Sequence, residues 1–323
     1  MGRSYIISII LFFATFTAKG QQLPSYSQYM MNGFLLNPAI AGSDGYTSVN
    51  ITAREDWVGF INSPRTHAIS VQSRILKRSH IIKSRSIGKK VLKPSSEGRV
   101  GIGGYVFNDK NGLVDRSGFQ MTYSYHIFIN NNQLSFGLSG GAFQFKINEN
   151  ELQFKDPNEP LINNGTKKVV YVPDASFGIF FSSYSYNIGF SVAQLFQSVL
   201  KVGSYGNYRM IRHYYFMGRY RYDFLNGFEI EPSFLLKTTE RLNFQVDINC
   251  KVYYKEDYWA GLAFRTNGAI IAMLGVRVNK YYFGYAFDYI FSSIRKHCYG
   301  SHEVVIVIKF GSSARRYRWL ERY

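Results

Sequence analysis

Histidine and serine side chains are the residues from which this chain would build a hydrolase site, and histidines with carboxylates could build a metal site. The 323-residue sequence holds six histidines, namely His67, His80, His126, His213, His297 and His302. None stands at ligand spacing from a carboxylate or another histidine. By its phase His126 lies on the inner face of a strand, and the other strand histidines have no obvious serine partner. The sequence therefore predicts neither an enzyme nor a metal site.

Glycine and cysteine patterns also carry little chemistry. Gly101, Gly103 and Gly104 form a cluster, but they lie in a strand-like segment and not between a strand and a helix, so no phosphate-binding loop is expected. Glycine in a strand more often indicates curvature or close packing. Cys250 and Cys298 are too few for a disulfide scaffold or a thiolate-built metal site. We expect no cofactor.

Strict alternation of apolar and polar residues runs along most of the chain. In residues 119–129, Phe119, Met121, Tyr123, Tyr125 and Ile127 alternate with polar residues, which is the signature of a half-buried strand. The same period predicts fourteen strands, at 45–55, 65–76, 99–108, 117–129, 133–147, 174–182, 186–194, 212–224, 227–237, 241–254, 257–266, 269–278, 281–290 and 302–310. An even number suits a closed antiparallel barrel.

Composition favours a barrel in a membrane. Hydrophobic residues make up 46% of the chain and aromatic residues 17%, which excludes a disordered protein. Outside the first 20 residues, no apolar run approaches the ~18 residues that a membrane-spanning helix needs. A soluble β-sandwich is the alternative, but the strand number and the density of Tyr and Phe on one face favour lipid contact. The fold class predicted is an all-β outer-membrane barrel.

The N-terminus indicates export. Residues 1–20 combine Arg3, an apolar stretch and small residues at Ala18 and Gly20, as in a cleaved signal peptide. Residues 21–44 contain apolar side chains without alternation, so we expect this segment to lie at or in the periplasmic mouth of the barrel and to plug it. The barrel itself would cover residues 45–310, and residues 311–323 would form a basic C-terminal tail.

The polar face of the strands predicts a charged lumen. Candidate lumen charges are Arg219, Arg221, Asp223, Asp247, Lys251 and Arg265, with Arg54, Arg74, Arg277, Glu229, Glu231 and Asp288 on the same face. Because isolated charges away from water are costly, such a wall should be wetted or paired. The lumen is therefore either a polar channel or is packed with salt bridges and a plug.

Loop lengths suggest an orientation. Tight turns follow alternate strands, whereas connections near 56–64, 148–173, 195–211 and 291–301 are long, and long loops face outward in bacterial barrels. One long basic connection, 77–98, falls on the short-turn, periplasmic side. It could dock an acidic periplasmic protein or lipid head groups; nucleic acid is not expected for an exported chain. The docking candidates are Lys83, Arg85, Lys89 and Lys90.

A specific motif precedes the first strand. Residues 25–32 read Ser-Tyr-Ser-Gln-Tyr-Met-Met-Asn, and residues 36–43 read Leu-Asn-Pro-Ala-Ile-Ala-Gly-Ser. With the block around Trp57, this sequence resembles the PorP/SprF family of type IX secretion system membrane proteins of Bacteroidota. The residues that match the family motif are Ser27, Gln28, Tyr29, Met30, Asn37, Pro38, Ala39, Gly42, Arg54, Trp57, Gly59, Pro64 and Thr66.

The resemblance implies a function. Family members assist the secretion or surface attachment of large proteins, including gliding adhesins, that carry a type B C-terminal domain. They work with periplasmic components of the same system, and no enzyme activity is implied. The expected partners are thus a large adhesin-like cargo, periplasmic secretion components and outer-membrane lipid. An independent porin-like solute channel is the alternative, and it would conduct ions steadily without a protein partner.

Overall fold

A computed structural model describes residues 23–75, 99–129, 132–147, 169–202, 206–266, 268–291 and 296–311. The predicted signal peptide, the basic connection and all but Gly311 of the tail lie outside the described residues. The same holds for the docking candidates Lys83, Arg85, Lys89 and Lys90.

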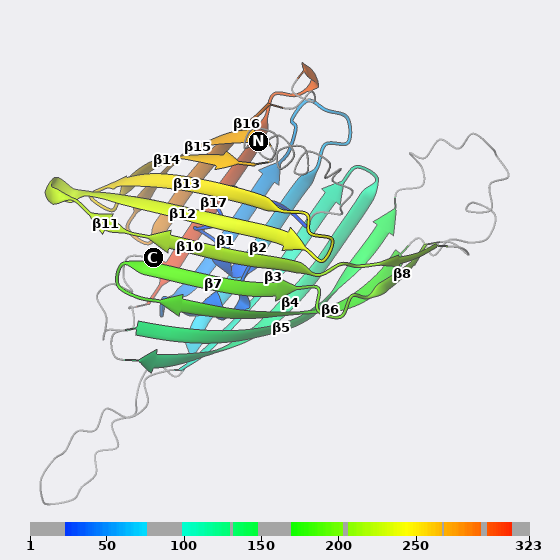
Figure 1. Cartoon of the computed structure of the whole chain (residues 1–323), viewed down its shortest axis with the longest axis horizontal. Coiled ribbons are helices and arrows are strands. Elements are labelled where there is room, and N and C mark those ends of the chain that lie inside the picture. The colour runs from blue at the N-terminus through cyan, green and yellow to red at the C-terminus, as the bar shows by residue number, and fades with distance from the viewer. Residues whose placement is uncertain are drawn as a thin grey trace, which may run out of the picture.

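The described chain forms one antiparallel β-barrel (Figure 1). Each wall strand pairs with the wall strands before and after it in the chain, so that β7 pairs with β10, and the wall closes where the first strand, β1, pairs with the last, β17. The first half contains β1 (Thr47–Glu55), β2 (Arg65–Ile75), β3 (Val100–Asn111), β4 (Val114–Ile129), β5 (Asn132–Ile147), β6 (Val169–Ser182) and β7 (Tyr186–Ala193). The second contains β10 (His213–Tyr220), β11 (Tyr222–Asp223), β12 (Phe228–Thr239), β13 (Gln245–Tyr254), β14 (Tyr258–Arg265), β15 (Ala269–Val278), β16 (Tyr281–Ile290) and β17 (Ser301–Phe310).

The predicted number of wall strands is confirmed. β11 continues β10 after Arg221 and pairs with the same neighbour, β12, so the wall has fourteen strands. Some boundaries were wrong. β3 and β4 extend to a two-residue turn at 112–113, and β6 begins at Val169. The sequence 195–211, predicted as a loop, contains a separate hairpin of β8 (Val199–Val202) and β9 (Gly206–Arg209).

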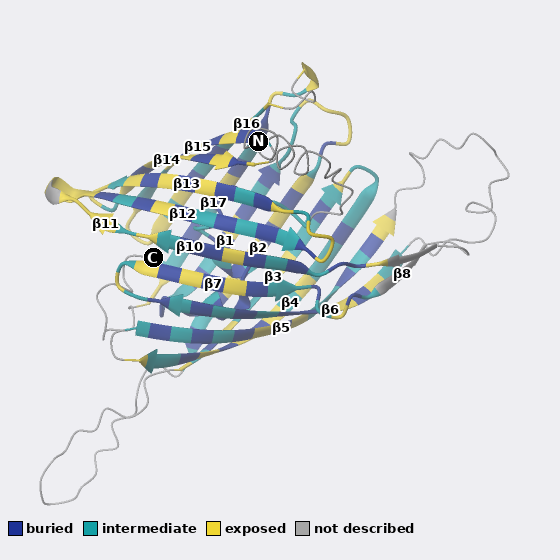
Figure 2. Cartoon of the chain, viewed as in Figure 1, coloured by how far each residue is buried: buried dark blue, intermediate teal, exposed yellow. Residues whose placement is uncertain are grey.

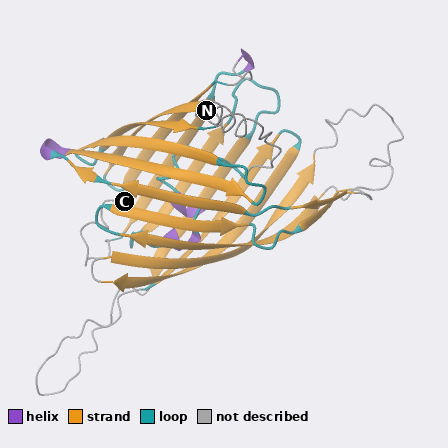
Figure 3. Ribbon diagram, viewed as in Figure 1, coloured by secondary structure: helices purple, strands orange, loops and turns teal. Residues whose placement is uncertain are grey.

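Burial alternates along the wall strands (Figure 2). Outward positions carry exposed large apolar side chains, such as Ile51, Ile69, Met121 and Leu274, whereas most inward positions are buried and many are polar. An apolar outer face with a polar interior is the pattern of a transmembrane barrel. The helices of the described residues are single 3₁₀ turns, two of which, η1 (Gly33–Leu35) and η2 (Pro38–Ile40), lie inside the barrel (Figure 3). Within the described ranges, no helix is long and apolar enough to cross a membrane.

The barrel has two distinct ends. At the turn end, β1 begins, β17 ends, and turns such as 183–185 and 279–280 join neighbouring strands. At the loop end lie the connections 56–64, 194–212 and 291–300. β3 to β6 have 12 to 16 residues, against 8 to 10 for β13 to β17. These longer strands lead to the β8–β9 hairpin, with which β6 is in contact.

Candidate functional site in the lumen

Residues 23–46, which we call the lumen segment, run through the barrel from one end to the other. At the loop end, the Lys237 ammonium donates to the Leu23 carbonyl oxygen at 2.9 Å. At the turn end, Asp44 and Lys309 form an ion pair at 3.3 Å. The segment therefore extends from the turn end, where it joins β1, to the loop end, and it occupies the full length of the lumen.

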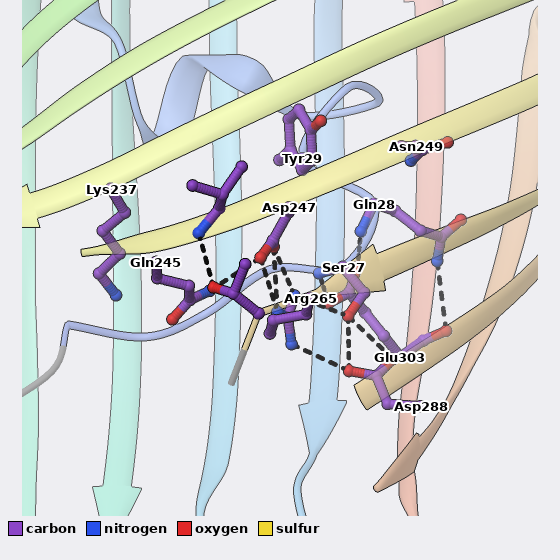
Figure 4. Close-up of polar contacts among 12 residues, drawn as sticks. Ser27, Gln28, Tyr29, Lys237, Gln245, Asp247, Asn249, Arg265, Asp288 and Glu303 are labelled. Carbon is purple, nitrogen blue, oxygen red and sulfur yellow. Dashed lines mark hydrogen bonds and ion pairs between the residues drawn. The ribbon is translucent and has the colours of Figure 1, made fainter. Parts of the chain in front are cut away.

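The polar contacts of the lumen segment centre on Ser27 (Figure 4). The two oxygens of the Glu303 carboxylate accept the backbone N–H groups of Ser27 and Gln28, both at 2.7 Å. The Ser27 hydroxyl lies 2.8 Å from Asp288 Oδ2 and 2.7 Å from an Arg54 nitrogen. Three strands, β1, β16 and β17, therefore hold two consecutive residues of the segment.

Ion pairs complete this cluster. Arg54 pairs with Asp288 at 2.8 Å and with Glu303 at 3.2 Å. Arg265 pairs with Asp247 at 2.9 Å and with Asp288 at 3.1 Å. These three acids outnumber the two arginines, so the backbone N–H donors of the lumen segment supply the remaining stabilisation that buried carboxylates require. We call Ser27, Gln28, Arg54, Asp247, Arg265, Asp288 and Glu303 the Ser27 anchor.

The middle of the lumen segment binds the opposite wall. Asn37 caps η2 by accepting from the Ala39 N–H, and its amide donates to the carbonyl oxygens of Ile179 and Phe190. The Ser191 hydroxyl donates to the Leu36 carbonyl oxygen at 2.7 Å. Polar groups of this irregular backbone are thus satisfied by β6 and β7, as burial away from water demands.

Apolar side chains fix the lumen segment further. Tyr29 and Leu36 are only 4% and 8% exposed, and they pack with Tyr215, Met217 and Leu235 of β10 and β12. Because these side chains would be costly to leave in water, their burial stabilises the segment inside the barrel.

Inward-facing glycines make room for the lumen segment. A Cβ atom at Gly137 would lie 2.3 Å from the Pro38 carbonyl carbon, and one at Gly178 would lie 2.1 Å from Asn37 Oδ1. A Cβ atom at Gly101 would likewise lie 2.1 Å from the Ala41 carbonyl oxygen. Any side chain at these positions would push against the segment, so the glycines define its seat. This accounts for part of the glycine cluster at 101–104.

At the turn end, the lumen segment meets His126. The Ala41 carbonyl oxygen lies 2.6 Å from Ser124 Oγ and 3.1 Å from His126 Nε2, and Ser135 Oγ lies 2.8 Å from His126 Nδ1. His126, which the alternation places on the inner face, therefore has two serine neighbours. Both serines and the histidine are fully buried against the segment. The pairs therefore hold the chain in place and leave no room for a substrate.

A second charged group lies on the neighbouring strands, around Glu231 of β12, whose register partner is Lys251 of β13. Arg221 pairs with Glu231 at 2.8 Å and with Glu229 at 3.5 Å, and Arg219 also approaches Glu231. Lys251 is fully buried. Asp223 differs from the other lumen candidates, because it is exposed at the end of β11, where Tyr184 donates to it. A cavity of about 160 Å³ beside Arg219 and Arg221 separates this group from Tyr29 and Met30.

The motif residues fall into two groups. Ser27, Gln28, Tyr29, Met30, Asn37, Pro38, Ala39 and Gly42 belong to the lumen segment, and Arg54 is its main cationic contact. Trp57, Gly59 and Pro64 lie in the connection between β1 and β2. Thr66 donates to Asp109 at 2.8 Å. Glu303 was not among the predicted lumen charges, although Val304, Ile306 and Ile308 on the outer face already place it on the inner one.

Among the described residues, no group of three or more His, Cys, Asp or Glu side chains could hold a metal ion. The charges of the lumen instead neutralise one another or hold the lumen segment. The arrangement places the protein's own chain inside its barrel.

A closed fourteen-stranded barrel with an apolar outer face and a polar, occupied lumen defines an outer-membrane β-barrel protein. The family model of the type IX secretion system membrane protein PorP/SprF matches residues 18–308, and the chain belongs to this family. The family and the fold point to a secretion or transport protein of the outer membrane that is not an enzyme.

Solved barrels show similarity of a more distant kind. The toluene transporter TbuX of Ralstonia pickettii has 8% identity and a TM-score of 0.48, over 86% of this chain and 93% of that one. The KdgM porin has 8% identity and a TM-score of 0.37, over 82% of this chain and 99% of that one. Among curated proteins, none matches the chain.

Proposed function

We propose that this barrel assists the secretion or surface attachment of a large adhesin-like protein that carries a type B C-terminal domain. Membership of the PorP/SprF family supports a place in type IX secretion. The observation that carries the proposal is the lumen segment, which occupies the barrel from Leu23 to Asp44. A lumen occupied by the protein's own chain suits a partner protein of a secretion machine better than a steadily open solute channel.

The lumen segment acts, in this proposal, as a plug. Its polar groups are bonded to the wall on both sides, through the Ser27 anchor and through Asn37, and glycines of the wall accommodate it. A flexible leader would need neither these hydrogen bonds to the wall nor the glycines that make room for it. The barrel could then assist the secretion or surface attachment of an exported protein without letting small solutes cross the membrane.

The turn end is the proposed contact with periplasmic components. Ile75 pairs with Val100 and Phe310 pairs with Thr47, so the basic connection and the C-terminal tail both join the barrel at this end. Their positive charge suits an acidic periplasmic protein or acidic lipid head groups. The residues proposed for docking remain Lys83, Arg85, Lys89 and Lys90.

Two measurements on the purified native protein test the proposal. The first is co-purification from native membranes, in which one large exported protein should accompany the barrel. The second is conductance in planar bilayers, in which the barrel should remain closed. A steadily conducting barrel that carries no exported protein would support the porin-like alternative and contradict the secretion role.

A further inference from the structure

Two loops are joined into one projection at the loop end. The Val58 N–H donates to the Gly300 carbonyl oxygen at 2.9 Å, and the Tyr299 N–H donates to the Val58 carbonyl oxygen at 2.8 Å. The Trp57 N–H donates to Ser301 Oγ at 3.2 Å. We call residues 56–64 and 296–300 the loop pair. These bonds tie the connection after β1 to the connection before β17.

Large apolar side chains of the loop pair face solvent. Ile61 is 84% exposed, Tyr299 is 79% exposed and Phe60 is 44% exposed. None of them lies in a strand, so membrane contact along the barrel wall does not account for them. Exposed apolar groups that gather on a small surface mark interaction sites more often than chance does.

The backbone of the loop pair is held in an unfavourable conformation. Trp57 has a φ of 53° and Asn62 a φ of 56°, in the left-handed region, which is unfavourable for a bulky residue such as Trp57. Gly59 has a φ of 96°, and a Cβ atom there would lie 2.9 Å from the Tyr299 ring. Such conformations persist where the surroundings enforce them and a function uses them. Here they turn Phe60 and Ile61 outward on a fixed frame.

Charges separate the loop pair from the lipid-facing band. Ile51 and Ile69 lie on the outer face of β1 and β2. Toward the loop end, the same face carries the exposed ion pair of Glu55 with Arg65, at 3.8 Å. Charged side chains on the outer wall are tolerated near the interface and not in the hydrocarbon layer. Ile61 therefore lies beyond the membrane boundary, in the aqueous phase.

We propose that the loop pair is a docking surface for an exported protein, which receives Ile61, Phe60 and the Tyr299 ring in an apolar pocket. The longer loops of outer-membrane barrels face the cell exterior, where exported proteins are the available partners. Aromatic and large aliphatic side chains on a fixed frame are the usual centres of protein interfaces. The inference rests on the proposed function, because it assigns the surface on which the exported protein is held.

The loop pair is connected to the lumen segment through Arg54. This side chain pairs with Asp56, at the base of the loop pair, at 2.6 Å, and it donates to Ser27 Oγ at 2.7 Å. A partner that moves Asp56 would change one of the contacts that hold the lumen segment. Docking outside the barrel and closure of the lumen therefore share one residue.

The test compares Ile61→Ser/Tyr299→Ser with Leu242→Ser/Phe244→Ser in native cells. The second pair is a matched control, because Leu242 and Phe244 are 60% and 59% exposed in another loop of the same end. Heat-modifiable mobility on unboiled gels reports whether each barrel is folded. We expect the loop-pair variant to lower the co-purified exported protein about tenfold or more, and the control to retain it.

A photo-crosslinking residue at position 61 supplies a second readout. It should form an adduct with the same exported protein that accompanies the wild type, identified by mass. Adducts with lipid alone would overturn the proposal in favour of a membrane contact. If the wild type carries an exported protein that the loop-pair variant holds equally well, the inference fails while the proposed function stands. If the wild type carries none, both fail.

Discussion

Glu303 and Ser27 are 276 residues apart in the chain, yet the Glu303 carboxylate accepts the Ser27 backbone N–H at 2.7 Å inside the barrel. The bond is made to the backbone, so it depends on the path of the lumen segment and not on the identity of one side chain. Arg54 stands beside both residues and neutralises the carboxylate. Strand β17, which closes the barrel against β1, thus also fixes the segment that fills it.

The first prediction concerns this carboxylate. Glu303→Gln should lower the free energy of unfolding by about 2–4 kcal/mol, because it removes a buried charge that pairs with Arg54. Denaturant unfolding in detergent measures the change. Glu55→Gln is the control, since Glu55 pairs with Arg65 on the exposed outer face and should change the stability by less than about 1 kcal/mol. Equal losses for both variants would contradict a special role for Glu303.

The second prediction concerns closure of the lumen. Ser27→Asp places a fourth carboxylate in the Ser27 anchor, where three acids already outnumber Arg54 and Arg265. The net repulsion should expel the lumen segment. Planar-bilayer recordings should then show conductance that the wild type lacks. Adding Glu303→Gln removes one of the facing charges and should partly restore closure. A Ser27→Asp barrel that is folded and still closed would show that the anchor does not hold the segment.

The third prediction concerns the seat of the lumen segment. Gly137→Val should displace residues 38–39, because even a Cβ atom at this position would lie 2.3 Å from the segment. Gly140→Val is a control on the same strand, β5, where a Cβ atom has no neighbour within 4 Å. A cysteine introduced at Ala39, which is fully buried, reports the displacement by its reaction with a maleimide. Identical labelling of the two variants would contradict the claim that Gly137 makes room for the lumen segment.

The fourth prediction separates lipid contact from simple exposure. Ile248 and Leu242 are 59% and 60% exposed, but Ile248 lies on the outer face of β13 and Leu242 lies in a loop. Ile248→Arg should cost about 2–4 kcal/mol in liposomes if the residue is near the bilayer midplane, because the charge enters lipid. Leu242→Arg should be nearly neutral, because that side chain is already in water. The free energy of folding into liposomes distinguishes the two.

Sequence periodicity predicts the wall strands well, but it predicts poorly the strand ends past the rim and the β8–β9 hairpin. Alternation such as that of 119–129 survives in β4 because lipid faces one side of the strand and the lumen the other. Past the rim this contrast vanishes, so the alternation predicts a strand that ends before Asp109 and Lys110, which belong to β3. The β8–β9 hairpin was missed for the same reason.

The lumen segment was harder to place from sequence. Its residues lack any period, because irregular backbone in a lumen is satisfied by side chains from distant strands, such as Ser191 and Arg74. Apolar content indicated burial, and charge on the inner strand face indicated pairing. Which residues meet depends on the barrel register, and a single sequence does not contain that information. Asp223 has the phase of a lumen residue, but its place at the end of β11 leaves it exposed.

The last prediction concerns the basic connection between β2 and β3. Replacing Lys83, Arg85, Lys89 and Lys90 by Gln should leave the barrel folded and inserted, because Ile75 and Val100 already pair at its two ends. Secretion of the exported protein should fall, since docking between opposite charges loses its attraction. Raised salt should weaken the wild-type contact similarly, because the Debye length is about 8 Å at physiological ionic strength and shorter above it. Secretion assays and co-purification across a salt series measure both effects. Normal secretion by the variant, with partners retained at high salt, would show that the connection is only a solvated loop. Cleavage of the connection by protease added to intact cells would show that it faces the cell exterior, which contradicts the orientation on which the docking depends.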